Sequence, residues 1–129
     1  MTKFPNNQNN KKREYNLEER LALFAEKIIE LMKKIPKDAI NSRMISQIVA
    51  SAGSTGANYA EANESESKKD FIHKTSIVKK ELRETKHWLR LLAKANPNYQ
   101  EEFREIWKEN QELLLIFAQI IRTCKGNKS

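Results

Sequence analysis

The chain has 129 residues, a mass of 15.1 kDa, a net charge of +7 and a pI near 9.5. This length fits one domain with a real core, and three Pro, three Gly and 8% aromatic residues disfavour a turn-rich β-sandwich or barrel. The single cysteine, Cys124, excludes an intramolecular disulfide and a zinc site built on several cysteines.

The sequence contains no pattern typical of a membrane or secreted protein. No apolar run approaches the roughly 18 residues of a membrane span, and the opening segment MTKFPNNQNNKKREY has no apolar signal core. We therefore expect a cytoplasmic protein, and the excess of positive charge favours an anionic partner.

Residues 1–16 are predicted to form a disordered basic tail. They contain Pro5, five Asn and one Gln, followed by the cations Lys11, Lys12 and Arg13. Such a composition buries too little apolar surface to fold. The folded domain is expected to cover residues 17–125, with a short C-terminal tail at 126–129.

The first predicted helix covers residues 17–35. Asn16 is a good capping residue, and two glutamates follow it in the first turn, near the positive end of the helix dipole. The apolar residues step by four and three along one face and stop before Pro36: Leu17, Leu21, Phe24, Ile28, Leu31 and Ile35.

The second segment contains the small-residue run ASAGSTGA at 50–57, which by itself resembles a flexible or phosphate-binding loop. A phosphate loop needs a preceding strand and a Gly-Lys-Ser/Thr ending, and the segment has neither. The four-three spacing continues through Gly53 and Gly56, on Asn41, Ile45, Ile48, Ala52, Thr55 and Tyr59. We predict a helix with a turn at 63–66. Its glycines cost about 1 kcal/mol each, which a closely approaching helix would offset.

Two further helices follow from the same spacing. One face comprises Phe71, Thr75, Val78, Leu82, Thr85, Leu89 and Leu92, with Ser67 and Asp70 as a cap and an end near Asn96-Pro97. The other comprises Phe103, Ile106, Asn110, Leu113, Phe117, Ile120 and Cys124. Four such helices predict an all-α fold, an up-down-up-down antiparallel four-helix bundle.

Four motifs give the chain a family resemblance: SQIVAS, GANYAEA, SKKDFIHK and KKELRETKHWLR, in this order and spacing. From about Leu17 to Leu92 the sequence resembles the bacterial four-helix-bundle family encoded by intervening sequences in 23S rRNA genes. It departs from the family pattern at Ala50, Thr55 and Ala60, where an Arg, a β-branched aliphatic residue and often a Cys are usual. The resemblance implies a ring-forming homo-oligomer, commonly a pentamer, without catalysis, and related bundles accompany reverse transcriptases and contact nucleic acid.

The residues themselves give little support for an enzyme, a metal site or a cofactor. Glu84 and His87 have the Glu-x-x-His spacing of di-iron bundles, but such sites need two of these motifs and two more carboxylates. The other histidine, His73, has no glutamate three residues before it. Cys124 lies on an apolar helical face, where a free cysteine acts as a small hydrophobe. No cofactor and no metal is expected.

A polar cluster is predicted where the second helix ends. Asn58, Tyr59 and Glu61 follow the small-residue run, and Lys80, Glu81, Glu84 and Thr85 of the third helix are their expected partners. A ligand pocket is the alternative, but no nucleophile, base and oxyanion donor converge there. We therefore assign Gly53, Gly56, Asn58, Tyr59 and Glu61 to helix packing or oligomer contact.

The third helix also carries a basic stripe. Lys79, Arg83, Lys86, Arg90 and Lys94 are one turn apart, on a face expected to point away from the core. Repeated around a ring, this stripe would form a multivalent surface for the phosphates of RNA or DNA, assisted by Lys11, Lys12 and Arg13. No aromatic residue alternates with it, so base-specific recognition is not expected.

Two functions fit the sequence. The first is a non-enzymatic ring that binds nucleic acid through its phosphates or delivers it to a partner protein. The alternative is a purely structural or protein-interaction oligomer, in which the basic face only keeps the protein in solution.

Overall fold

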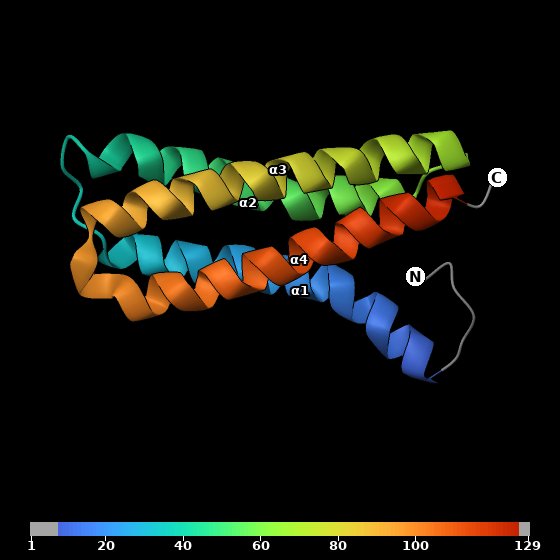
Figure 1. Ribbon diagram of the computed structural model, residues 1–129, viewed down its shortest axis with the longest axis horizontal. Helices are drawn as coiled ribbons and strands as arrows, with labels where there is room; N and C mark the ends of the chain where they lie inside the picture. Colours follow the sequence, from blue (N-terminus) through green and yellow to red (C-terminus); the bar gives the residue numbers. More distant parts are fainter. Residues whose placement is uncertain (1–7, 127–129) are drawn as a thin grey trace.

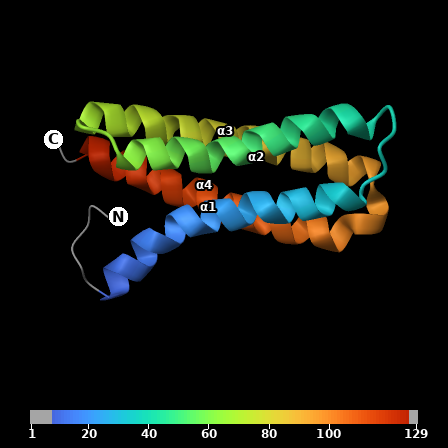
Figure 2. The same cartoon turned by 180° about the vertical axis from the view of Figure 1, so that it is seen from behind.

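The computed structural model describes the backbone of residues 8–126 and the side chains of residues 17–126. This part of the chain contains four α-helices: α1 (Gln8–Lys34), α2 (Asn41–Asn63), α3 (Lys68–Ala95) and α4 (Gln100–Gly126), with a short 3₁₀ turn, η1 (Pro97–Tyr99), before α4. Each helix runs antiparallel to the next, α2 and α3 form one layer, and α1 and α4 form the other (Figures 1 and 2). The all-α four-helix bundle is confirmed.

The start of α1 differs from the sequence prediction. This helix begins at Gln8 and not at Leu17, so Asn16 lies inside it and does not cap it. The segment between contains no Pro or Gly, and its Lys, Arg and Glu residues are good helix formers, so nothing local stops the helix. Residues 1–7 and 127–129 of the two predicted tails lie outside the described part of the chain.

The predicted boundaries of α3 are confirmed by its caps. The Ser67 side chain accepts a hydrogen bond of 3.0 Å from the backbone N–H of Asp70. This N–H is one of those in the first turn that have no partner within the helix. At the other end, Asn96 is the C-cap and Pro97 follows it. The short turns on both sides of α3 hold it antiparallel to α2 and α4.

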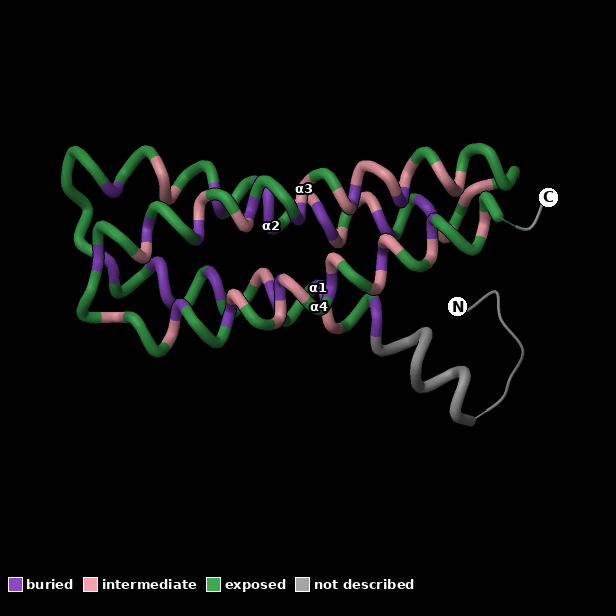
Figure 3. The backbone as a smooth tube through the Cα atoms, viewed as in Figure 1, coloured by how far each residue is buried: buried purple, intermediate pink, exposed green. Residues whose placement is uncertain are grey.

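The core lies where the apolar faces of the four helices meet, as the alternation of buried and exposed residues in Figure 3 shows. Leu21, Ile28, Leu82, Leu113 and Phe117 are each 0% exposed. Some details differ from the prediction: Ile45 and Phe71 are only half-buried, and near the end of α4 the core residue is Ile121, whereas Ile120 and Cys124 are half-buried. A straight helix with 3.6 residues per turn drifts from a seven-residue repeat, which moves the buried position by one residue.

Buried polar pairs fix the register between neighbouring helices. The Oγ of Ser51 in α2 and the Oγ1 of Thr85 in α3 are 2.8 Å apart. The Nδ2 of Asn110 in α4 donates to the carbonyl of Leu82 in α3 at 3.2 Å. These bonds define which residues of adjacent helices lie at the same level.

Candidate nucleic-acid interface

The basic stripe lies along the side of α3 that adjoins α4. The Nζ of Lys86 is 5.4 Å from the centroid of the Trp107 ring in α4, which is within the range of a cation–π contact. Arg83, Arg90 and Lys94 are exposed, whereas Lys79 and Lys86 are half-buried. The stripe lies away from the buried face of α3, but Lys79 and Lys86 are only partly exposed, and Lys86 contacts α4 where full exposure was expected.

None of these five cations forms an ion pair with any carboxylate of residues 17–126. The reason lies in α4, whose glutamates at 109 and 112 face α1 and bind Arg20 there. Helical spacing places these acidic residues about a third of a turn or more from Trp107, which faces α3. The positive charges of α3 are consequently not neutralised by the neighbouring helix.

Two residues of α4 extend this surface and were missed by the sequence analysis. Trp107 is half-buried beside Lys86, so an aromatic ring does lie among the cations, although it comes from another helix. Arg104 is one turn earlier on the same side of α4, and its ion pair with Glu101 is long at 3.8 Å and exposed, hence weak. Only the antiparallel register of α3 and α4 could have revealed them.

We call this surface the basic edge, and define it by five residues of α3 and one of α4: Lys79, Arg83, Lys86, Arg90, Lys94 and Arg104. The tail cations Lys11, Lys12 and Arg13 lie outside the described side chains. Their contribution stays a prediction.

The two glycines of α2 have different surroundings. A Cβ on Gly56 would stand 3.9 Å from the Cβ of Leu21, so α1 does approach this position closely. A Cβ on Gly53 would meet no described atom within 4 Å, and Gly53 is exposed. Gly56 therefore faces α1 at ordinary van der Waals distance, whereas no neighbour within the described part of the bundle accounts for Gly53.

The predicted polar cluster is not assembled as expected. Asn58 donates to the carbonyl of Ser54 in its own helix at 2.9 Å. Tyr59 is in the core, with its ring edge-on to Phe117 at a centroid distance of 5.3 Å. These residues do not meet Glu81, Glu84, Lys80 or Thr85 because the α2–α3 hairpin pairs Ser51 with Thr85, which places residues 58–61 opposite residues nearer the turn.

Glu61 illustrates this register. It is exposed and binds the Nζ of Lys74 at 2.6 Å. The hydrogen bond from this lysine to Glu61, together with the charge of the carboxylate, raises the pKa of Lys74. The pair is a surface link between α2 and α3 near their turn, where ion pairs contribute little stability.

The carboxyl group of Glu81 in α3 has a perturbed pKa. Burial raises the pKa of Glu81, and the nearby charge of Glu84 raises it further. A perturbed acid alone makes no active site, because catalysis also needs a nucleophile or base in reach.

No group of three or more His, Cys, Asp or Glu side chains among the described residues could hold a metal ion. The ring of His87 packs edge-on against Trp88 at 4.8 Å, and Cys124 is a half-buried free thiol. No helix in the described part of the chain is long and apolar enough to cross a bilayer.

Comparison with known proteins shows the family. A family model described as 23S rRNA-intervening sequence protein matches residues 13–119, and the chain therefore belongs to this family. A crystal structure of a protein of unknown function from the S23 ribosomal protein family of Bacteroides thetaiotaomicron VPI-5482 is 32% identical, with a TM-score of 0.73. The match covers 81% of this chain and 97% of that one. No curated protein matches the sequence.

Proposed function

We propose that this member of the 23S rRNA-intervening sequence protein family is a non-enzymatic, ring-forming bundle, commonly pentameric by family resemblance. In this proposal it binds RNA or DNA without sequence preference and can deliver it to a partner protein. The observation that carries the proposal is the basic edge, whose five α3 cations have no ion-pair partner among residues 17–126.

Electrostatic attraction between the basic edge and the phosphates drives the proposed binding. Lys79 and Lys94 are fifteen residues apart along the helix, about 22 Å at 1.5 Å per residue, so several phosphates can contact the edge at once. Each contact releases condensed counterions, and the logarithm of the affinity should fall with the logarithm of salt concentration by about 0.7–0.9 per phosphate. Copies of the edge around a ring would add avidity.

The proposed assembly is supported by the exposed face of α2. Residues 44–60 contain no charged side chain, in a chain that is 32% charged. Val49 is 36% exposed, and Ala50, Gly53, Ala57 and Ala60 are also exposed. This face supports contact with a second copy, which would explain why position 53 is a glycine although no described atom of its own chain lies near it. Light scattering that found a monomer at roughly tens of micromolar would contradict the assembly.

The test of binding uses charge reversal at the three exposed positions, Arg83→Glu, Arg90→Glu and Lys94→Glu. Lys86 is left intact because its contact with Trp107 supports packing. Fluorescence anisotropy with a labelled single-stranded RNA or DNA at several salt concentrations should show near-complete loss of binding. Circular dichroism and light scattering should show unchanged helicity and assembly.

The matched control reverses three exposed cations elsewhere: Lys33→Glu, Arg43→Glu and Lys125→Glu. It makes the same change in net charge, so it should reduce affinity only slightly. Equal losses in the two variants would mean that overall charge, and not the basic edge, binds the polyanion. Absence of binding by the unaltered protein at low salt would favour the purely structural oligomer.

A further inference from the structure

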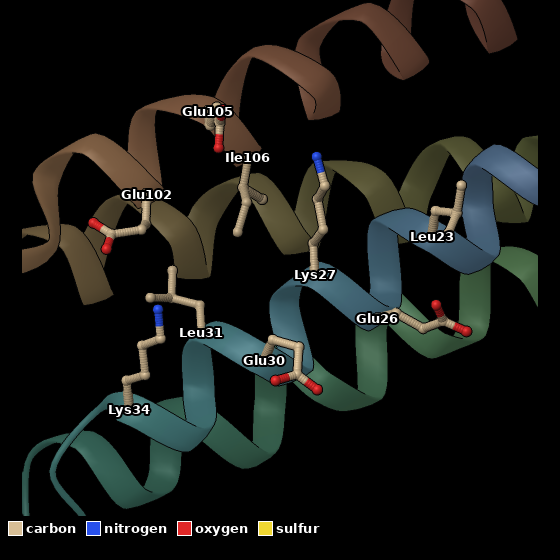
Figure 4. A pocket seen from close by; sticks show the side chains of 9 residues that line it. All are labelled: Leu23, Glu26, Lys27, Glu30, Leu31, Lys34, Glu102, Glu105 and Ile106. Atoms are coloured by element: carbon tan, nitrogen blue, oxygen red, sulfur yellow. The ribbon is translucent and has the colours of Figure 1, made fainter.

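A groove lies between α1 and α4, on the side of α4 away from the basic edge (Figure 4). Its volume is about 420 Å³. Leu31 and Ile106 point into the space between the two helices and form the floor, and they are 3% and 4% exposed. Leu23 forms a wall and is 47% exposed, which is high for a large apolar side chain.

Polar contacts join α1 to α4 at one end of the groove and to η1, just before α4, at the other. At one end, Arg20 binds both carboxylate oxygens of Glu109, at 3.0 and 2.9 Å. At the other, the hydroxyl of Tyr99 donates to the carbonyl of Lys34 at 3.2 Å. The groove between these contacts is therefore a fixed feature of the bundle and not a chance gap between unattached helices.

The rim of the groove is acidic, in contrast to the rest of the protein. Two glutamates come from α1 and two from α4, against two lysines of α1, so the local net charge is −2 in a chain of net charge +7: Glu26, Glu30, Glu102, Glu105, Lys27 and Lys34. Of the four glutamates, only Glu30 has an ion pair with a described residue, at 3.6 Å to the exposed Lys33. Three rim carboxylates thus have no such partner.

We propose that this groove binds a basic amphipathic helix of a partner protein. Leu23 and Lys34 are eleven residues apart along α1, about 16 Å, which matches three turns of helix. Apolar side chains one turn apart on such a helix would pack mainly on Leu23, because Leu31 and Ile106 below it are almost fully buried. Its Lys or Arg residues would meet the rim glutamates. Charge complementarity of this kind selects a basic partner and rejects nucleic acid.

A second copy of this chain fits the groove less well. Its basic helix is α3, and that helix offers the groove cations but few apolar anchors. Leu91, at 37% exposed, is the large apolar residue of α3 with the most exposure. The inference deepens the proposed delivery function, because the basic edge on the other side of α4 stays free for nucleic acid while the groove holds a protein.

The probe is a synthetic helical peptide of about 14 residues, made of Leu and Lys with leucines one turn apart. A peptide with Gln in place of Lys is the reference, because an anionic peptide would bind the basic edge. Fluorescence anisotropy should show binding of the Leu–Lys peptide and at least about tenfold weaker binding of the Leu–Gln peptide. The net charge of +7 repels a cationic peptide from the remaining surface, so its binding reports the groove.

The rim variant carries Glu26→Gln, Glu30→Gln, Glu102→Gln and Glu105→Gln. It should bind the Leu–Lys peptide about tenfold more weakly, and Leu23→Ser should weaken binding about fivefold through lost apolar contact. Both variants should bind nucleic acid at least as well as the parent, because the basic edge is untouched.

The matched control makes the same charge change on other exposed glutamates: Glu18→Gln, Glu19→Gln, Glu64→Gln and Glu66→Gln. An equal loss of peptide binding in the control, or equal binding of the two peptides, would overturn the proposal. So would a lower oligomer mass of the rim variant in light scattering, because the groove would then belong to a contact between copies. Failure of nucleic-acid binding alone would leave the peptide result intact.

Discussion

Replacing Gly53 with alanine is expected to stabilise the bundle by about 1 kcal/mol, the difference in helix propensity between the two residues. The backbone allows this, because no described glycine has a positive φ. The new Cβ would meet no described atom within 4 Å, so no packing penalty offsets the gain. For a domain of this size, the midpoint of thermal unfolding should rise by roughly 4 °C.

Leucine substitutions at Gly53 and Gly56 distinguish packing within one chain from contact between chains. Gly53→Leu points away from the bundle and should leave the monomer as stable as the alanine variant, while it weakens assembly if α2 contacts another copy. Gly56→Leu would be forced against Leu21 of α1, where the Cβ atoms would already be 3.9 Å apart. It should destabilise the bundle itself by about 1–3 kcal/mol.

Thermal unfolding followed by circular dichroism at about 1 μM measures the bundle, because dilution removes the contribution of assembly. Light scattering at roughly tens of micromolar measures the assembly. A Gly53→Ala protein that is less stable than the parent under dilute conditions would refute the reasoning from helix propensity. An unchanged oligomer mass for Gly53→Leu would show that this face of α2 is not an interface.

Three further predictions concern the polar contacts of the bundle. Arg20→Ala removes the two hydrogen bonds to Glu109 and should lower the free energy of unfolding in urea by about 0.5–1 kcal/mol. The loss should be smaller at high salt, because both side chains are partly exposed. Asn96→Ala removes the side-chain amide that donates to the Oδ1 of Asn41 at 2.9 Å, and Asn41 is 3% exposed. The free energy of unfolding should fall by about 2 kcal/mol in the same assay. Glu81→Gln should raise stability at pH 7, because the folded state favours the protonated form of this carboxyl group, its pKa being raised by burial first and by Glu84 second. By the same linkage, the stability of the parent falls as the pH rises from the ordinary pKa of a glutamate to the raised pKa of Glu81. Unfolding measured as a function of pH should show a smaller fall in stability for Glu81→Gln over this range.

The sequence by itself determined the helices and their buried faces. The spacing of Leu21, Phe24 and Ile28, and of Val78, Leu82 and Leu89, is a local property of a helix with 3.6 residues per turn. The cap at Ser67 is equally local, since its partner is only three residues away. The same arguments predicted helix through the small-residue run, because the period continued across both glycines.

The tertiary structure alone decided which faces of the helices meet. Lys86 contacts Trp107 and Glu61 contacts Lys74 because the connecting turns and buried polar pairs fix how each helix is rotated and shifted against its neighbours. Gly53 and Gly56 have nearly the same local sequence, yet only Gly56 faces α1. Spacing along one helix says which residues share a face, but rotation about the helix axis depends on contacts between residues far apart in the chain. The unneutralised basic edge and the acidic groove on the two sides of α4 therefore emerge only when the helices are packed together.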